Sequence, residues 1–237
     1  PFAPREIEME RVSFGLAGTF DNGFDWNFDM TRSAEDNYGR QPDTGTSKLA
    51  AAIDGRGGPS GNETFDLFDP TANSQTLRDW LRSDQETWTN VVLSVVDFVM
   101  SGEVGGIDLA VGAQQRREKY DITRSPNSIV EFDAAGNLTK PADMIFLGGG
   151  TESSASRTTN AVFLEASADL SENLELKGAV RYEDLENDSN VDPKLSLRYQ
   201  ASDEVILRAS VSTSYREPSL SQLYTSTVGL QGIQDYN

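Results

Sequence analysis

The sequence contains no cysteine and no histidine among its 237 residues. A disulfide framework, thiolate or imidazole metal ligands, and catalytic triads built on histidine are therefore excluded. Basic residues are also scarce, with 20 Lys and Arg against 38 Asp and Glu and a formal net charge of −18. This excess of negative charge disfavours binding to nucleic acid and electrostatic docking of the chain onto anionic lipid headgroups.

Long hydrophobic runs are missing as well. The longest, from Val91 to Met100, is interrupted by Ser94 and Asp97, whereas a transmembrane helix needs about 20 apolar residues. The chain begins at Pro1 without an initiator methionine and without a basic and apolar leader. That start predicts either the removal of a leader or an internal piece of a longer protein.

The clearest pattern that is present has a period of two residues, which is typical of β-strands. From Leu174 to Tyr182, apolar residues alternate with polar ones such as Lys177 and Arg181. A charged second face does not suit the interior of a β-sandwich. The same alternation, with a less regular stretch at 88–103, predicts eight strands, at residues 12–20, 24–30, 88–103, 107–114, 162–170, 174–182, 195–199 and 205–211.

The connections between these strands alternate between very short and long. The short ones, at 21–23, 105–106, 171–173 and 201–203, are rich in the Asn, Asp, Gly and Ser residues that tight hairpin turns use. The long ones are polar and lie at about 33–86 and 121–156, with a shorter link at 186–191 and a tail beyond Pro218. Outer-membrane barrels have short periplasmic turns and long extracellular loops. The sequence therefore predicts an all-β fold, an antiparallel transmembrane β-barrel segment of about eight strands with this arrangement.

A barrel with a water-filled interior also fits the composition. Only 37% of the residues are hydrophobic, and a barrel wall needs just one apolar face. We expect Leu176 and Val180 to face lipid and Ala179 to face the lumen. Aromatic residues near strand ends are candidates for the interfacial girdle, although such residues also suit a soluble sheet. The candidates are Phe20, Phe24, Tyr120, Tyr182, Tyr199 and Tyr215.

Short motifs follow one another along the chain, from Phe68-Asp69-Pro70 through Arg181-Tyr182-Glu183-Asp184 to Tyr215-Arg216-Glu217-Pro218-Ser219-Leu220. Together they resemble the barrel of TonB-dependent outer-membrane receptors. The resemblance covers nearly the whole chain and rests on the order of the motifs, since none of them is specific alone. The chain departs from the family's pattern at Asp192, where Asn is usual, at Tyr215, where Phe is usual, and at Glu217, where Ala is usual. The matching segments include Phe68-Asp69-Pro70, Leu109-Ala110-Val111-Gly112-Ala113, Arg181-Tyr182-Glu183-Asp184, Asp192-Pro193-Lys194, Leu207-Arg208-Ala209-Ser210 and Tyr215-Arg216-Glu217-Pro218-Ser219-Leu220.

The resemblance implies that residues 1–237 are part of a single β-barrel domain, a middle segment of a receptor with an N-terminal plug and a barrel of about 22 strands. No segment of the sequence matches a plug domain or a TonB box. The implied function is uptake of a scarce solute across the outer membrane of a Gram-negative bacterium, the solute being an iron-siderophore complex, cobalamin or an oligosaccharide. The implied partners are outer-membrane lipid, the small-molecule solute, and the TonB complex, which acts through a plug outside these residues.

We expect neither an enzyme nor a cofactor, and the sequence assigns no catalytic, metal or substrate-binding residue. Two alternatives stay open. One is a passive outer-membrane channel or small structural β-barrel without energy coupling, since a free-standing barrel of about eight strands is permitted by size. The other is a secreted β-rich adhesin.

Three further features receive structural interpretations. Oxygen-bearing side chains occur at alternate positions, as at the start of a calcium loop, at Asp184, Glu186, Asp188, Asn190 and Asp192. The glycine and the closing Glu of a calcium loop are missing, which favours a solvated loop. Gly148-Gly149-Gly150 lies in a long polar loop and lacks the lysine of a P-loop, so we expect a flexible hinge. The segment Leu77 to Leu81 is predicted to form a short helix in which Trp80 has a packing role.

Overall fold

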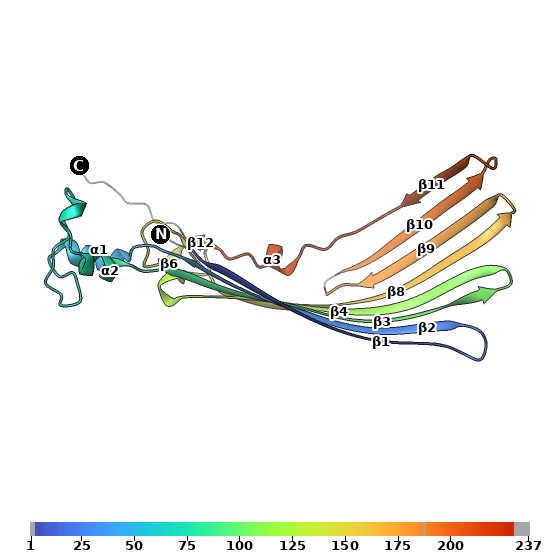
Figure 1. Ribbon diagram of the computed structural model, residues 1–237, viewed down its shortest axis with the longest axis horizontal. Coiled ribbons are helices and arrows are strands. Elements are labelled where there is room, and N and C mark those ends of the chain that lie inside the picture. Colours follow the sequence, from blue (N-terminus) through green and yellow to red (C-terminus); the bar gives the residue numbers. More distant parts are fainter. Residues whose placement is uncertain (1–2, 187, 230–237) are drawn as a thin grey trace.

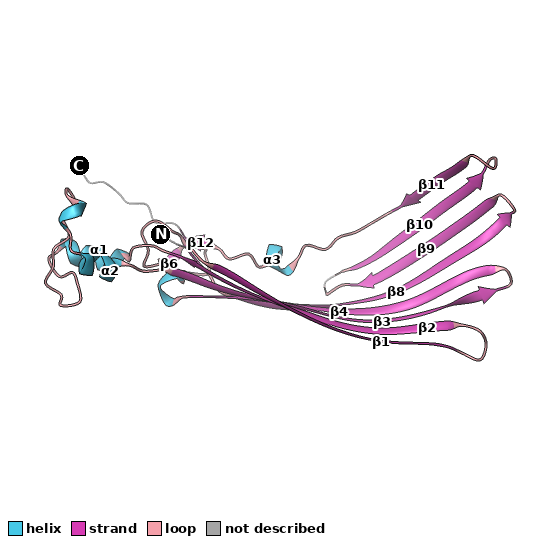
Figure 2. Ribbon diagram, viewed as in Figure 1, coloured by secondary structure: helices cyan, strands magenta, loops and turns pink. Residues whose placement is uncertain are grey.

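The computed structural model describes residues 3–186 and 188–229. Its main element is an eight-stranded antiparallel sheet in which the strands follow one another in chain order (Figures 1 and 2). All eight predicted strands are confirmed. They are β1 (Arg5–Thr19), β2 (Asp25–Gln41), β3 (Gln85–Val104), β4 (Ile107–Arg124), β8 (Ser153–Ser171), β9 (Leu174–Asp184), β10 (Ser189–Gln200) and β11 (Ile206–Ser212).

The sheet is an open, curved wall rather than a closed barrel. Strands β1 and β11 form its two edges, and among the described residues each of them pairs with one neighbour in this sheet. Figure 1 shows β8 to β11 rising away from the plane of β1 to β4, so that one face of the wall is concave. No helix in the described part of the chain is long and apolar enough to cross a membrane.

Several strands are longer than the sequence predicts, at the end away from the short turns. Strand β2 continues to Gln41, β4 continues to Arg124 and β8 begins at Ser153. The long connections therefore span residues 42–84 and 125–152 rather than the predicted 33–86 and 121–156. In Glu35-Asp36-Asn37 and similar stretches both faces carry polar side chains, so the alternation that identifies a strand in sequence disappears there.

The register gives the sheet two chemically different faces, because residues opposite one another in antiparallel strands point to the same side. Leu164 pairs with Val180 on what we call the outer face. One residue further along the strands, Glu165, Ala179 and Lys194 lie side by side on what we call the inner face. The expected separation of Val180 from Ala179 onto opposite faces follows from this register.

The outer face carries a band of exposed apolar side chains that crosses all eight strands. It includes Phe14, Leu16, Met30, Phe98, Val111, Val162, Leu164, Val180, Leu195, Leu207 and Val211. Val211 is 69% exposed and Phe14 is 54% exposed, which would be costly in water over so wide a surface. A continuous exposed apolar surface of this kind marks contact with a partner or a membrane, and its alternation with a polar inner face is that of a barrel wall in lipid.

Most of the proposed girdle aromatics border this band. Phe20, Phe24, Tyr182 and Tyr199 lie on the outer face at its borders. The prediction is wrong for Tyr120, which is only 8% exposed and lies on the inner face, where a later segment of the chain covers it. Tyr215 follows β11 and lies outside the sheet.

The short turns contain glycine where the backbone requires it. Gly105 and Gly106 have φ angles of 61° and 81° and form the two-residue turn between β3 and β4. Two successive positive φ angles define the hairpin turn whose twist matches that of the flanking strands. Gly23, with a φ angle of 85°, ends the turn between β1 and β2. The predicted short connections are confirmed, and the last of them extends to Val205.

The first long loop, residues 42–84, has a small hydrophobic core of its own. It contains α1 (Thr46–Ile53), the 3₁₀ helix η1 (Pro70–Ala72) and α2 (Gln75–Leu81). Ala52, Leu77 and Leu81 are buried together, and Trp80 packs against them. The predicted helix around Trp80 and the packing role of this residue are confirmed. The side chain of Ser74 accepts a hydrogen bond from the Leu77 amide and so caps α2.

The second long loop, residues 125–152, is also ordered, and it contradicts the expected glycine hinge. Its elements are η2 (Pro126–Ser128), β5 (Glu131–Phe132), β6 (Leu138–Lys140) and β7 (Gly149–Gly150), and β7 pairs with β12 (Val228–Gly229). Gly149 is buried, and a Cβ atom there would lie 2.5 Å from Cβ of Ala142 and 2.6 Å from the Ser128 carbonyl oxygen. These glycines permit close packing rather than flexibility.

Because the two faces meet different surroundings, the same substitution should cost different amounts of stability at two neighbouring residues. Val180→Arg places a charge on the apolar outer face and is expected to cost about 2 to 4 kcal/mol near the middle of the bilayer. Ala179→Arg should cost much less, because Ala179 lies between Glu165 and Lys194 on the polar face. Reversible unfolding of the full-length protein into lipid vesicles measures both values. Equal losses would mean that both faces are packed in a dry core.

Candidate functional site

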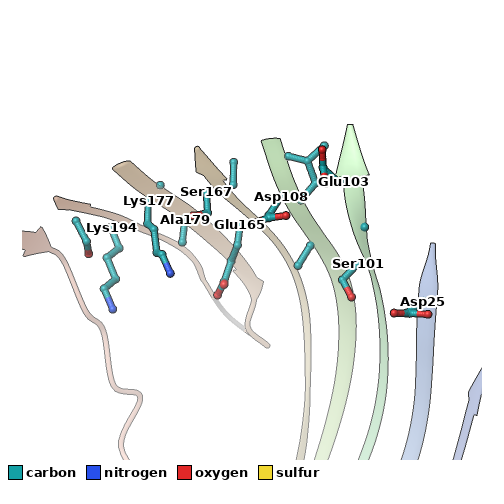
Figure 3. Close-up of a pocket in the computed structure, with 15 residues that line it drawn as sticks. Asp25, Ser101, Glu103, Asp108, Glu165, Ser167, Lys177, Ala179 and Lys194 are labelled. Atoms are coloured by element: carbon teal, nitrogen blue, oxygen red, sulfur yellow. The ribbon is translucent and has the colours of Figure 1, made fainter. Parts of the chain in front are cut away.

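The inner face carries an open pocket of about 460 Å³ near the short turns (Figure 3). Its charged side chains are divided by strand. The acids Asp25, Glu103, Asp108 and Glu165 come from β2, β3, β4 and β8, whereas Lys177 and Lys194 come from β9 and β10. Small residues such as Ser101, Ser167 and Ala179 keep the space between them open. The cavity can hold a polar group by ion pairs and hydrogen bonds, and it contains no thiol or imidazole for covalent chemistry.

Further from the short turns, a chain of polar contacts crosses the inner face over several strands. Arg181 on β9 donates to Oε1 of Gln114 at 2.9 Å and to Oε1 of Glu183 at 2.8 Å. Gln114 in turn donates to Oδ1 of Asp97 on β3 at 2.6 Å. The Arg181 guanidinium also lies 5.9 Å from the ring centre of Phe163 on the intervening strand β8. Arg181, Gln114 and Asp97 thus hold one another in position across the inner face.

The chain crosses back over the inner face after β11. We call this segment, residues 213–223, the strap; it contains the helix α3 (Leu220–Leu223), which Figure 1 shows on the concave side of the sheet. The strap leaves the sheet beside Asp192, whose Oδ1 accepts a hydrogen bond from Thr213 Oγ1 at 3.2 Å. Further on, Leu220 is buried against Tyr120 and Ile122 of β4. This contact explains why Tyr120 is unavailable for an aromatic girdle.

One buried arginine holds the middle of the strap. The Arg157 side chain is 5% exposed, and its Nε lies 2.5 Å from Oε2 of Glu118. Its Nη1 donates to the Pro218 carbonyl oxygen at 2.7 Å and forms an ion pair of 3.0 Å with Glu217. Sequence reasoning did not identify Arg157, which lies between a predicted loop and a predicted strand. The signal in the sequence that points to this contact is Glu217, an acid at a position where the motif usually has Ala.

The two long loops are tied together at the other end of the sheet. The Asp43 carboxylate, in the first loop, accepts a hydrogen bond from the Leu147 amide of the second loop at 2.6 Å. Asp143 of the second loop accepts bonds from the amide and hydroxyl of Ser47 at 2.7 and 2.6 Å. We call the two joined loops the platform. Phe68, which is 100% exposed, and Phe146, which is 79% exposed, project from it.

Asp84 lies at the base of the platform and connects three segments. Its carboxylate pairs with Arg40 of β2 and with Nε of Arg82 at 2.8 Å. Its carbonyl oxygen accepts a bond from Nδ2 of Asn127 in the second loop at 2.9 Å. Burial alone would raise the pKa of Asp84, but the hydrogen bonds from Arg82 and Arg40 outweigh it and hold the pKa below its ordinary value.

The alternating acidic residues do not assemble a cation site. In the described part of the chain no three acidic side chains are grouped so that they could hold a metal ion. Asp192 instead accepts a bond from Nδ2 of Asn190 at 2.8 Å and anchors the strap through Thr213. Asp188 accepts a bond from the Ser189 amide at 2.7 Å. These contacts are those of a turn between two strands.

Comparison with known proteins gives one family and several solved structures. Residues 3–237 match the family described as "TonB dependent receptor-like, beta-barrel". A crystal structure of the ferric enterobactin receptor PfeA in complex with BCV-L6 is 18% identical, with a TM-score of 0.53, over 92% of this chain and 27% of the receptor. A mutant of that receptor from Pseudomonas aeruginosa is 17% identical, with a TM-score of 0.55 and the same coverage. The chain thus spans about a quarter of these receptors. A comparison with curated proteins gives no significant match.

The lowered pKa of Asp84 predicts that the platform loosens in acid. A carboxyl with a lowered pKa in the folded state contributes stability above its unfolded pKa of about 3.9, and this contribution is lost as the pH falls through the folded value. Asp84→Asn should remove about 2 kcal/mol of platform stability at neutral pH, the range for hydrogen bonds to charged groups. Hydrogen exchange at the Leu147 amide measures this. Asp54→Asn, at an exposed ion pair with Arg56, is the control and should change little.

Removal of Arg157 is expected to release the strap. Arg157→Leu leaves Glu217 without its cation and leaves Glu118 only the longer ion pair of 3.8 Å with Arg116. Breaking a buried pair in this way costs about 3 to 5 kcal/mol. Trypsin should then cut after Arg216 much faster than in the unchanged protein. Arg208→Leu, at an exposed position of β11, is the matched control and should leave the cleavage rate unchanged. An equal cleavage rate in Arg157→Leu would show that the contacts of Leu220 and Thr213 hold the strap without Arg157.

Proposed function

The chain belongs to the TonB-dependent receptor β-barrel family, and on this premise we propose that it is part of an outer-membrane receptor that takes up a scarce solute. The candidate solutes are an iron-siderophore complex, cobalamin or an oligosaccharide. Barrels of this family lie in the outer membrane of Gram-negative bacteria. The two solved relatives are named as receptors for ferric enterobactin, which favours an iron-siderophore complex over the other two.

The observation that carries the proposal is the pairing of an apolar outer face with a polar, hollowed inner face on the same eight strands. Such a wall separates lipid from water and gives a hydrated solute a polar surface to pass along. Binding and passage, rather than bond formation, are what this surface supports.

In this proposal residues 1–237 form part of one barrel domain. The chain spans 27% of the solved receptors, so further strands and the plug come from segments outside these residues. TonB acts through that plug. The exposed rings of Phe68 and Phe146 on the platform offer the solute its first apolar contact before it enters the barrel.

Uptake by cells tests the proposal. A strain that lacks the full-length gene should lose energy-dependent accumulation of its labelled ferric siderophore and regain it when the gene is restored. Deletion of the tonB gene or addition of a protonophore should abolish uptake even when the barrel is present. Uptake that continues under both conditions would assign the protein to passive channels, which is the alternative left open by the sequence.

The proposal also fixes the orientation of the barrel. The turn at Asn22 is expected to face the periplasm and the loop at Ser60 the outside, because short turns are periplasmic in such barrels. Single cysteines at these two exposed positions are probed on intact cells with an impermeant thiol reagent. Ser60→Cys should be labelled and Asn22→Cys protected, and the reverse result would invert the topology. Buried Gly149 is unsuitable for this test, because a side chain there would displace its neighbours.

A further inference from the structure

The strap lies over a group of charged and polar side chains on the inner face. The register places Glu118 of β4 opposite Arg157 of β8 and, two residues nearer the short turns along β4, Arg116 opposite Thr159. The strap brings Glu217 onto this group, with Oε2 3.0 Å from Nη1 of Arg157. A carboxylate that belongs to the strap thus sits on a part of the wall that carries two arginines.

The fit between Glu217 and this wall is incomplete. Its 3.0 Å contact with Arg157 is an ion pair without an aligned hydrogen bond, and Nη1 of Arg157 donates instead to the Pro218 carbonyl oxygen at 2.7 Å. Among the described residues, Oε2 of Glu217, Oγ1 of Thr159 and Nε of Arg116 are buried and find no hydrogen-bond partner. Thr159 is only 3% exposed, and an unpartnered polar group at such burial costs stability. The strap therefore covers the wall without satisfying its donors.

Without the strap, this part of the wall is a cationic site. Arg116 and Arg157 share one acid of the sheet, Glu118, which lies 2.5 Å from Nε of Arg157 and 3.8 Å from Nε of Arg116. The residues opposite Arg116 and Glu118 on β3 are apolar, namely Val95 and Leu93. Two guanidinium groups and one carboxylate leave one positive charge, and the Thr159 hydroxyl adds a hydrogen-bond donor beside it.

The acids on the surrounding strands do not cancel this charge. Glu183 of β9 accepts a hydrogen bond from the Arg181 guanidinium at 2.8 Å. Asp192 of β10 is engaged by the first residues of the strap. Glu35 of β2 lies two strands from β4, or roughly 10 Å away. Asp184 faces the opposite side of the sheet, because it pairs with Asn160 in an outer-face row.

This cationic site lies on the path of a solute along the inner face. Glu118 stands on β4 between Asp108, in the pocket near the short turns, and Arg124, where β4 meets the second long loop. Figure 1 shows α3 of the strap on the concave side of the sheet. The motif that this segment resembles usually has Ala at position 217, and Ala offers no charge to Arg157. The contact is therefore a property of this chain.

We propose that Arg157, Arg116 and Thr159 form a binding site for a carboxylate group of the transported solute, and that Glu217 occupies this site until the solute displaces it. A free carboxylate can approach the guanidinium groups in the geometry of aligned N–H donors and accept the Thr159 hydroxyl as well, which Glu217 does not achieve. Its arrival releases the strap from Arg157, so that solute binding and strap opening are coupled. The inference rests on the transport function proposed above and narrows the solute to one that carries a free carboxylate.

The test uses the purified full-length receptor in detergent micelles, with tricarballylate, a small tricarboxylate, as the probe at constant ionic strength. Glu217→Ala and Glu217→Gln remove the competing carboxylate. A site that is open in about 10% or less of the unchanged protein should then bind tricarballylate about tenfold more tightly, or better, by calorimetry. Glu204→Ala removes an exposed acid from the turn before β11 and is the matched control, with unchanged binding. Heat-modifiable migration in gels verifies folding.

A second substitution separates the site from the strap. Thr159→Val should not speed hydrogen exchange of the Leu223 and Tyr224 amides, which donate to the Ser219 and Leu220 carbonyl oxygens of α3, because the Thr159 hydroxyl does not hold the strap. In the Glu217→Ala background it should weaken tricarballylate binding about tenfold, as expected for loss of a hydrogen bond to a charged group. In the unchanged receptor tricarballylate should speed exchange of these amides, whereas its uncharged triamide should not.

The proposal is overturned by equal tricarballylate binding in Glu217→Ala and the unchanged receptor, by an equal gain in Glu204→Ala, by equal binding of the triamide, or by a Thr159→Val change that leaves binding as it was. Energy-dependent uptake of the labelled ferric siderophore is measured in cells with the same variants. Uptake without a gain of tricarballylate binding in Glu217→Ala would overturn this inference alone. That gain without energy-dependent uptake would overturn the transport function alone.

Discussion

Every backbone N–H and C=O group that crosses hydrocarbon needs a partner, and between the edge strands β1 and β11 the neighbouring strands provide it. Pairing in chain order then fixes the register, and the register fixes which side chains face which solvent. Val180 and Ala179 differ by one position and face opposite environments. A slip of one residue would move Lys194 into the apolar band and Leu195 into the polar wall, so the inner cavity and the outer apolar band both depend on this single register.

The sequence predicts the features that depend on that register. It predicts few of the features that depend on contacts between residues far apart in the chain. All eight strands and the short turns are predictable, because the two faces meet different solvents and the alternation is visible. The strand ends at Gln41 and Arg124 are not, because water lies on both faces there. Tyr120, Gly149 and Arg157 are misjudged or missed for another reason. Each contacts or pairs with a residue far away in the chain, namely Leu220, Gly229 and Glu217.

Net charge is a poor guide to how this surface meets its surroundings. The chain carries an excess of acids, which argues against electrostatic attraction to anionic lipid. The acids, however, are placed mainly on the inner face and on the strand extensions and loops, for example at Glu165 and Asp84. At the border of the apolar band, Arg32 and Arg117 stand on the outer face together with the acid Asp184. The net charge of the whole chain therefore does not give the charge of one face, because salt confines the effect of each charge to roughly 10 Å.

The strap also bears on the order in which the protein folds. The contacts of the sheet join strands that are consecutive in the chain, so hairpins can add one after another with small losses of loop entropy. The strap instead brings Leu220 back to Tyr120, and the residues after it bring Ser226 to Arg124, across 102 residues in the second case. It can dock only when β4, β8 and the strands after them already stand side by side. Burial of Leu220 is thus a natural reporter of the last step of assembly.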